Sequence, residues 1–272
     1  QIPTCQTRHD AKVTNRQDKI SVSKPTDIER VSQNRVVKLF EEELNYTYLG
    51  DWQQREGNSN IEEEYLTNYL KRKGYSDEHI SKAIFELQQV ATNFSDSLYT
   101  TNKNVYSKLR NGVKVKVSAG ENYDTVKLID WQHPEDNDFY IAEEVTLRGN
   151  KDKRPDIVLY INGIAIAVLE LKRGIVDIGE GIRQNITNMQ DRFIKPFFAT
   201  NQILFAGNDS EGLRYGTISS PEKFYLSWKE DEEDNSRLLL DKYLIKMCSK
   251  ERIIELICDF IVFDAGIKKL PR

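Results

Sequence analysis

The stretch Arg154–Gly174, RPDIVLYINGIAIAVLELKRG, is the most hydrophobic part of a rather polar chain, and its pattern decides the expected fold. Two apolar runs, residues 157–161 and 164–169, are joined by the dipeptide Asn162-Gly163. Strands that are apolar on both faces are typical of the centre of a sheet that is covered on two sides. Asn-Gly is a strong signal for a tight turn between antiparallel strands. The stretch therefore predicts a buried, central β-hairpin.

Charged residues stand at the ends of this hairpin, with Asp156 before the first strand and Glu170 and Lys172 at the end of the second. The turn decides whether they meet, because a one-residue slip in register moves every side chain of a strand to the other face. A strict two-residue turn would point Asp156 and Glu170 to opposite faces. A three-residue loop ending at Gly163, or a bulge farther along, would bring all three charged residues to one face. Asn-Gly suits either turn.

If they share a face, the two acids would be diagonal neighbours on adjacent strands, about 7–8 Å apart at the backbone. Two such carboxylates suit a hard divalent cation such as Mg²⁺. Lys172 could stabilise the extra negative charge on a phosphate under attack. The simpler interpretation is a pair of strands that reach water. The position of Asp156 and Glu170 at the mouth of one buried hairpin favours a catalytic site.

Helical and strand patterns surround the hairpin in a clear order. Helices are expected at 25–46, at 59–91 as two helices separated at Gly74, at 98–109, at 182–198, at 236–248 and at 250–264; further strands are expected at 113–118, 124–131, 138–147, 202–207 and 213–217. This order indicates an α/β fold with a mixed central sheet flanked by helices.

Composition divides the chain into an arm and one large domain. Residues 1–24 are polar and without periodicity, which predicts a flexible N-terminal arm. Residues 25–262 are expected to form the domain, with a helical subregion at about 58–110. The acidic run at 229–235 is expected to be a solvated turn.

Charge and hydropathy exclude several classes of protein. The formal net charge of −4 argues against the broad basic surface of a free-standing DNA-binding protein, although it leaves room for a local basic groove. No apolar run approaches the roughly 18 residues of a membrane span. The N-terminal residues also lack the apolar core of a signal peptide. We therefore expect a cytoplasmic protein without a membrane partner.

Cysteine, histidine and glycine patterns exclude further chemistry. The three cysteines are scattered and the three histidines form no cluster, which argues against a disulfide framework, a zinc site or a His-based triad. No Walker A pattern is present, so this chain by itself should not hydrolyse ATP.

The motif and its surroundings resemble a known family. Pro155-Asp156 followed by Glu170-Leu171-Lys172 resembles the core of the PD-(D/E)xK nucleases. The sequence from about residue 29 to the C-terminus is similar to the amino-terminal part of type I restriction enzyme R subunits. Segments that carry this likeness include ERVSQNRVVKLFEEELNYTYLGDW, KLIDWQHPEDNDFYIAEEV, KRPDIVLYINGIAIAVLELKRG and EGIRQNITNMQ. The end of the chain, DFIVFDAGIKKLPR, resembles the lead-in to the helicase motor of that family, so 263–272 would begin the linker to a motor outside this chain.

This resemblance implies an endonuclease that cuts double-stranded DNA with Mg²⁺ after ATP-driven translocation by the full-length subunit. It also implies methyltransferase and specificity subunits as partners, which read the DNA sequence. Position by position, Asp156 and Glu170 match the metal-binding acids and Lys172 matches the catalytic lysine. Because translocation normally triggers cleavage in this family, we expect the chain alone to cut DNA weakly or not at all.

Two further positions match the family less closely. Many relatives carry Gln-x-x-x-Tyr on the helix after the ExK motif; Gln184 matches the catalytic Gln, but Asn188 stands in place of Tyr. A helical wheel sets Gln184 opposite the apolar stripe, so a surface glutamine remains an alternative. Glu29 matches a metal-binding acid on the first helix, and its alternative is a capping-box acid after Thr26.

The basic residues next to the acids, Arg154, Lys153 and Arg173, are expected to contact DNA phosphates, and a solvated rim is the alternative for each. Glu143 and Glu144 could add charge near the site. The tryptophans Trp131 and Trp228 are expected to pack in the core rather than to stack on bases.

Two other classes of function remain open. The same fold could be a module that docks DNA or the methyltransferase without cutting, and a stand-alone repair nuclease is a third possibility. The presence of Asp156, Glu170 and Lys172 together favours the enzyme, and the helicase lead-in disfavours the stand-alone nuclease.

Overall fold

The computed structural model describes residues 25–93, 95–118, 120, 122–229 and 236–270 of the 272-residue chain, the side chains of 25–29 excepted. The expected arm at 1–24 and most of the acidic run at 229–235 lie outside the described residues.

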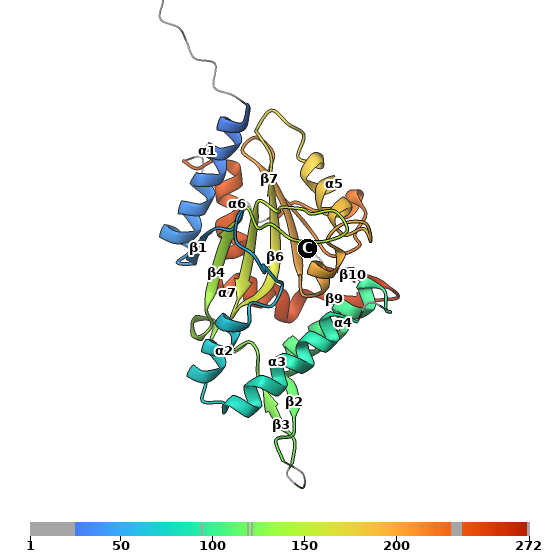
Figure 1. Ribbon diagram of the computed structural model, residues 1–272. Coiled ribbons are helices and arrows are strands. Elements are labelled where there is room, and N and C mark those ends of the chain that lie inside the picture. The colour runs from blue at the N-terminus through green and yellow to red at the C-terminus, as the bar shows by residue number, and fades with distance from the viewer. Residues whose placement is uncertain (1–24, 94, 119, 121, 230–235, 271–272) are drawn as a thin grey trace, which may run out of the picture.

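A six-stranded sheet forms the centre of the molecule (Figure 1). Its strands, in spatial order, are β1 (Thr47–Asp51), β4 (Phe139–Glu143), β5 (Ile157–Ile161), β6 (Ile164–Leu171), β7 (Ile203–Asn208) and β8 (Gly212–Gly216). β1 is parallel to β4 and β6 is parallel to β7, and the other neighbours are antiparallel. The expected α/β fold with a mixed central sheet is confirmed.

Helices flank this sheet and extend beyond one end of it (Figure 1). They are α1 (Pro25–Lys38), α2 (Glu63–Arg72), α3 (Asp77–Ala91), α4 (Leu98–Asn111), α5 (Gly179–Asn188), α6 (Leu239–Cys248) and α7 (Lys250–Glu255). Wider π turns, Leu39–Glu43 and Leu256–Phe260, continue α1 and α7, and 3₁₀ turns occur at Pro134–Asp136, Lys195–Ala199 and Glu222–Phe224. Two small hairpins lie outside the main sheet: β2 (Val113–Val115) with β3 (Asp124–Val126), and β9 (Val262–Asp264) with β10 (Ile267–Lys269).

Helix ends follow signals that the sequence carries. Ser76 accepts a hydrogen bond from the backbone N–H of His79 at the start of α3, as a helix N-cap does. Gly74 has a φ of +88° directly after α2, a conformation that glycine adopts without strain. The expected separation of 59–91 into two helices at Gly74 is therefore confirmed.

Several expected elements differ from the structure. The helix expected at 250–264 ends at Phe260, and Val262–Asp264 form strand β9 instead. The helix expected at 182–198 ends at Asn188, and a 3₁₀ turn with Pro196 near its start occupies Lys195–Ala199. Because proline cannot donate a backbone hydrogen bond, Pro196 prevents an α-helix from running through these last residues. The strands expected at 113–118 and 124–131 shrink to three residues each, since they pair only with each other. β1 was not expected, because its half-exposed residues show no alternation of apolar and polar side chains.

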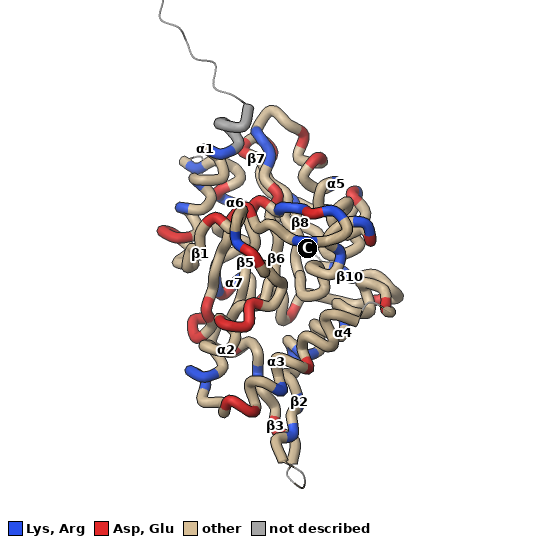
Figure 2. Tube along the Cα trace, in the orientation of Figure 1, with Lys and Arg blue, Asp and Glu red and all other residues tan. Residues whose placement is uncertain are grey.

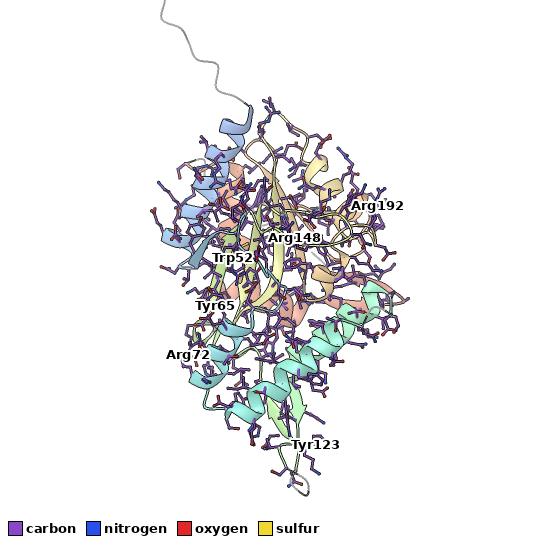
Figure 3. The ribbon with its side chains drawn as sticks, viewed as in Figure 1. Trp52, Tyr65, Arg72, Tyr123, Arg148 and Arg192 are labelled. Atoms are coloured by element: carbon purple, nitrogen blue, oxygen red, sulfur yellow. The ribbon has the colours of Figure 1, made fainter. Side chains whose placement is uncertain are left out.

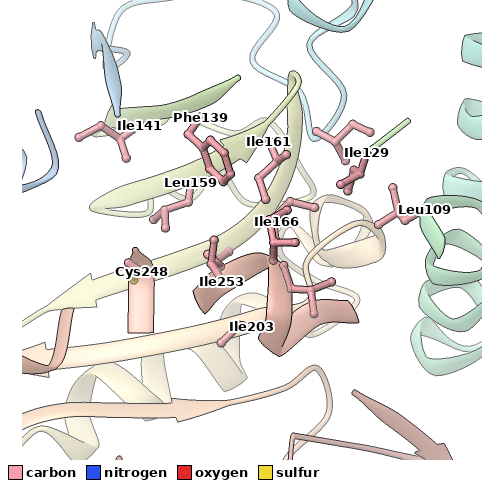
Figure 4. Packing of buried hydrophobic residues seen from close by; sticks show 14 of the residues in the cluster. Leu109, Ile129, Phe139, Ile141, Leu159, Ile161, Ile166, Ile203, Cys248 and Ile253 are labelled. Atoms are coloured by element: carbon pink, nitrogen blue, oxygen red, sulfur yellow. The ribbon is translucent and has the colours of Figure 1, made fainter. Parts of the chain in front are cut away.

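Alternate residues of the central strands face two separate hydrophobic layers. Ile157 and Leu159 belong to the layer that contains residues of α1, α6 and α7. Val158 and Tyr160 belong to the second layer, which contains residues of α5 and of the 3₁₀ turn after it. Figure 4 shows Leu159 against its neighbours in the first layer. The central strands are thus covered on both faces, as their apolar runs predict.

A two-residue turn closes the β5–β6 hairpin. Asn162 and Gly163 have φ values of +52° and +84°, as in the tight turns that suit antiparallel strands, and Ile161 pairs with Ile164. The amide of Asn162 fixes this turn: its Oδ1 accepts from the backbone N–H of Asp138 at 2.7 Å. Its Nδ2 donates to the Leu128 carbonyl and to Asn137 Oδ1 at 2.9 and 2.8 Å.

A β-bulge then changes the register of the hairpin. Tyr160 pairs with Ala165, but the next pair is Leu159 with Ala167, so Ile166 is the extra residue of the bulged strand. Beyond the bulge, Ile157 pairs with Leu169. The structure therefore combines the two-residue turn with the bulge that the sequence left as an alternative, and the next opposed pair is Asp156 and Glu170.

None of the helices in the described part of the chain has both the length and the apolar character needed to span a membrane.

Candidate active site

The bulge brings the three charged residues of the hairpin to one end of the sheet. Asp156 and Glu170 lie on the face of Val158 and Val168, because side chains two residues apart on a strand share a face. The backbone N–H of Leu171 donates to Asp156 Oδ2 at 2.7 Å, and Lys172 Nζ lies 4.0 Å from the same oxygen. The structure thus places Asp156, Glu170 and Lys172 together.

Two amides of α5 hold the Glu170 carboxylate. Glu170 is 0% exposed. Gln184 Nε2 donates to Glu170 Oε2 at 2.6 Å, and Asn188 Nδ2 donates to Glu170 Oε1 at 3.4 Å. Gln184 and Asn188 stand four residues apart and therefore lie one above the other on the same helix face. The Gln184 side chain is consequently half-buried against the acid rather than free on the surface.

Close contact between α5 and the sheet makes this arrangement possible. A Cβ atom at Gly181 would lie 3.1 Å from Ala206 Cβ and 3.5 Å from the Glu170 carbonyl oxygen, which leaves little room for a larger residue. Asn185 Nδ2 donates to the Phe205 carbonyl of β7 at 2.9 Å. The helix is therefore held close to β7 through Asn185 and close to β6, the strand that carries Glu170, through Gly181.

Sequence reasoning missed Asn188 as a contact of Glu170. The helical wheel followed the apolar stripe of α5, yet Gly181, Asn185 and Asn188 are also buried. Their spacing of four and three residues marks a second stripe, of small and amide side chains, on the helix. That stripe is the signal that could have predicted a polar contact between α5 and the sheet.

Burial raises the pKa of the Glu170 carboxyl well above its usual range, and the neighbouring Asp156 carboxylate raises this pKa further, whereas Lys172 lowers it. Two carboxylates that face each other in a buried place cannot both be ionised without a compensating positive charge. Lys172 supplies one such charge, and a cation bound beside the acids would supply another.

The available oxygens fit a hard divalent cation. Lys172 Nζ donates to the Leu171 carbonyl oxygen at 2.9 Å and lies 4.0 Å from Asp156 Oδ2, so a positive group already contacts two of these oxygens. Carboxylates and a backbone carbonyl are the ligand types that Mg²⁺ and Ca²⁺ take. No thiol or imidazole contacts this site among the described residues, so the donor set does not suggest zinc.

The three basic residues expected to contact DNA lie in different surroundings. Arg154 Nε pairs with Glu144 Oε2 at 2.6 Å. Lys153 Nζ lies 4.3 Å from the centre of the Phe193 ring. Arg173 directly follows Lys172 and is half-buried. Figure 2 shows acidic and basic positions interspersed over the molecule rather than separated into one basic face.

The two acids that end β4 have separate environments. Glu143 faces away from the candidate site, where Arg30, Gln33 and Tyr48 donate to its oxygens at 3.0, 2.9 and 2.6 Å. Glu144 contributes negative charge that raises the pKa of Glu170. Of the two expected sources of nearby charge, only Glu144 acts on the site.

The remaining expected residues lie away from this cluster or outside the description. Glu29 is within α1, but its side chain is outside the described residues. Trp131 donates to the Leu109 carbonyl at 3.1 Å, and Trp228 lies 6.1 Å from Tyr215, ring centre to ring centre, so both tryptophans pack within the protein.

A second group of possible metal ligands lies elsewhere, at Asp130, His133 and Asp136. Lys73 Nζ contacts Asp130 Oδ2 at 3.1 Å and Asp136 Oδ2 at 3.0 Å, so an ammonium already compensates these carboxylates. Unlike Glu170, none of these three residues is buried, so their carboxylates can be ionised in contact with water without a bound cation. Burial of the acid, rather than the presence of an ammonium, therefore distinguishes the acid cluster from this group.

The family model described as type I restriction enzyme R protein N terminus matches residues 28–223, a range that includes the whole acid cluster and α5. Among curated proteins, the type I restriction enzyme HindI endonuclease subunit of Haemophilus influenzae is 28% identical over 180 residues, which cover 61% of this chain and 17% of the relative. A type I restriction enzyme endonuclease subunit of Staphylococcus aureus is 27% identical over 128 residues, or 43% of this chain and 13% of that protein. The chain spans less than a fifth of either relative. Since the family model covers well over half of the chain, this protein belongs to the family of type I restriction enzyme R protein N-terminal regions.

Proposed function

We propose that this chain is the Mg²⁺-dependent endonuclease domain of a type I restriction enzyme R subunit, with a PD-(D/E)xK site. The observation that carries the proposal is the meeting of Asp156, Glu170 and Lys172 on one face of the sheet, with Glu170 fully buried. A buried acid with a raised pKa, such as Glu170, next to a second acid and a lysine, is typical of catalytic sites rather than of surfaces that only bind.

Asp156, Glu170 and the Leu171 carbonyl would hold the cation. When bound, Mg²⁺ would polarise a phosphate oxygen and offset the charge of the two acids. Lys172 would orient the attacking water and stabilise the negative charge that grows on the phosphate. Water oxygen then bonds to phosphorus, the bond from phosphorus to the 3′ oxygen breaks, and a proton passes to that oxygen. The products are a 5′-phosphate and a 3′-hydroxyl.

Gln184 and Asn188 would keep the Glu170 carboxylate in one orientation, and Glu29 would be a further ligand. Arg154, Lys153 and Arg173 would contact the phosphates on either side of the cut, and Arg154 would exchange Glu144 for a phosphate as it does so.

The rest of the enzyme would supply what this chain lacks. The relatives are much longer and are named as endonuclease subunits. We propose that residues 263–272 lead to a motor that uses ATP to translocate double-stranded DNA. Methyltransferase and specificity subunits would read the sequence, so the domain itself needs little basic surface.

The decisive experiment uses the full-length subunit in its complex, with plasmid DNA, ATP and Mg²⁺. Asp156→Ala and Lys172→Ala should each lower the cleavage rate at least ~100-fold, the scale of lost electrostatic stabilisation of a transition state. ATP hydrolysis should remain at the wild-type rate. Normal cleavage by either variant would favour the alternative, a module that docks DNA or the methyltransferase without cutting. The separate 272-residue chain should cut weakly or not at all, and strong cleavage by it would contradict the expected dependence on translocation.

A further inference from the structure

Residues of α3 and of the β2–β3 hairpin line a groove. These elements belong to the lobe that projects beyond the end of the main sheet (Figure 1). It has a volume of about 440 Å³, and its walls include Lys82, Phe85, Lys114, Lys116 and Tyr123. Figure 3 shows Tyr123 on the hairpin. None of these residues belongs to the acid cluster of β5 and β6.

Two aromatic rings stand exposed at this groove. Phe85 is 57% exposed and Tyr123 is 67% exposed. Single exposed apolar residues are common on protein surfaces, but two large rings at one concave place indicate a surface that binds a partner. Both side chains are therefore accessible to a ligand.

Lysines give the groove a positive charge. Lys82, Lys114 and Lys116 line it, with Glu86 as the one acid among the lining residues. The local charge is therefore positive on a chain whose formal net charge is −4. Lys116 Nζ also lies 5.9 Å from the centre of the Tyr123 ring. The groove thus attracts anions that also offer an apolar or aromatic surface.

The walls of the groove are held in place by the protein itself. Lys82 Nζ donates to the carbonyls of Lys116 and Val117 at 2.7 and 2.8 Å, which ties α3 to the hairpin. Lys114 lies on β2 and Lys116 directly follows its last residue, and both are exposed while Val115 between them is buried. A strand advances about 3.3 Å per residue, so two lysines spaced in this way stand about 6.6 Å apart in an extended segment. That interval is comparable to the separation of successive phosphates along one nucleic-acid strand.

We propose that this groove binds single-stranded nucleic acid. The lysines would contact the phosphates, and Phe85 and Tyr123 would stack on unpaired bases, which is how sequence-independent binders hold a single strand. A duplex hides the faces of its bases, and an acidic peptide would neutralise the lysines without using the flat rings. The proposal does not depend on catalysis by Asp156, because the two sites share no residue.

The test is fluorescence anisotropy of a labelled oligothymidine with the 272-residue chain, at low salt and with a chelator present. Tyr123→Ala and Phe85→Ala should each weaken binding about 5- to 100-fold, the range for the loss of one stacked base. Tyr123→Phe, which keeps the ring, should bind as the wild type does. For the wild type, log K should fall linearly with the logarithm of the salt concentration. In the Lys114→Gln/Lys116→Gln double variant this slope should be smaller in magnitude by about 1.4, that is about 0.7 for each lost phosphate contact.

A matched control is available at Phe224, which is 56% exposed with Lys223 Nζ 5.0 Å from its ring centre. Phe224→Ala should leave binding unchanged, and an equal loss in this variant would overturn the proposal. Equal affinity for a duplex of the same length would also overturn it, as would stronger competition by polyglutamate than by unlabelled oligothymidine. Arg173→Gln, which removes a positive charge next to the acid cluster, should bind the oligothymidine as the wild type does. This outcome separates the groove from the proposed nuclease site, because a loss of binding in Arg173→Gln would place the strand at the acid cluster instead.

Discussion

At the turn of the β5–β6 hairpin, Asn162 is buried among hydrogen-bond partners, whereas at the other end Glu170 is buried opposite a second carboxylate. The Asn162 amide uses its oxygen and both of its N–H groups within the protein. At the Glu170 end, Asn188 Oδ1 and the Tyr225 hydroxyl have no hydrogen-bond partner within the described part of the chain. One end therefore stabilises the fold, and the other holds charge that a bound cation would compensate.

The largest effect should come from Glu170→Gln in the full complex. Plasmid cleavage should fall at least ~100-fold, because the second carboxylate of the proposed cation site is lost. The free energy of unfolding of the chain should change by less than ~1 kcal/mol, since the substitution also removes a buried charge.

Glu143 is the matched control, since it is a buried carboxylate on the opposite face with three donors. Glu143→Gln should lower the free energy of unfolding by about 1–3 kcal/mol, because it breaks bonds to a satisfied charge. Urea unfolding of both variants checks the comparison. Equal destabilisation by the two substitutions would mean that Glu170 is a structural acid.

Asn162→Ala should lower the free energy of unfolding by about 2–4 kcal/mol, because it leaves buried backbone groups without partners. Asn45 is the matched control, an exposed asparagine with a φ of +55°. Asn45→Ala should cost only about 1 kcal/mol, the strain of a positive φ. Urea unfolding measures both variants. If Asn162→Ala and Asn45→Ala lower the free energy of unfolding by similar amounts, the backbone conformation rather than the hydrogen bonds of the Asn162 amide stabilises the turn.

Gln184→Ala should lower cleavage about tenfold, the equivalent of one hydrogen bond to a charged group. Gln190 lies just beyond α5 and is exposed, so Gln190→Ala should cut at the wild-type rate. If Gln184→Ala cuts at the wild-type rate, Gln184 does not contribute to cleavage and is a surface glutamine, as the helical wheel suggests.

Lys268 is intermediate between Asn162 and Glu170, because it is a buried ionisable group whose partners are neutral. Its Nζ donates to Asn102 Oδ1 and Gln202 Oε1 at 2.8 and 2.6 Å. Burial lowers the pKa of Lys268 well below 10.5. The unfolded chain therefore binds this proton more tightly, and the stability that Lys268 contributes is present above pH 10.5 and is lost as the pH falls toward the folded-state pKa. The free energy of unfolding of the wild type should rise relative to Lys268→Met by at most about 1.4 kcal/mol per pH unit in that window. Parallel pH dependence of the two proteins in urea unfolding would contradict the buried location of the ammonium.

The sequence predicted the sheet centre and most of the helices, because these depend on local patterns. Capping at Ser76 and the glycine at Gly74 act through neighbouring residues, so they can be read directly from the chain. β1 could not be predicted in this way, since its strand forms only through parallel pairing with β4, about 90 residues later in the sequence.

The candidate site was predicted in its residues but not in its geometry. Asp156, Glu170 and Lys172 were identified from their positions, yet their common face depends on the bulge at Ile166, which lies within a run where every residue is apolar. Periodicity cannot locate an extra residue in such a run. The contact of Asn188 with Glu170 was missed because it depends on how closely α5 approaches the sheet.

The bulge at Ile166 also means that the site is specified by chain length as well as by residue identity. Side chains alternate between the two faces along a strand, so the extra residue Ile166 between the turn and Glu170 decides which face Glu170 occupies relative to Asp156. Deleting Ile166 would leave every acid, the lysine and the turn residues in the sequence, yet it would point Asp156 and Glu170 to opposite sides of the sheet. A comparison of related chains by the identity of their acids alone would count such a variant as an intact nuclease. The spacing between Gly163 and Glu170 is therefore as much a part of the motif as the charged residues themselves.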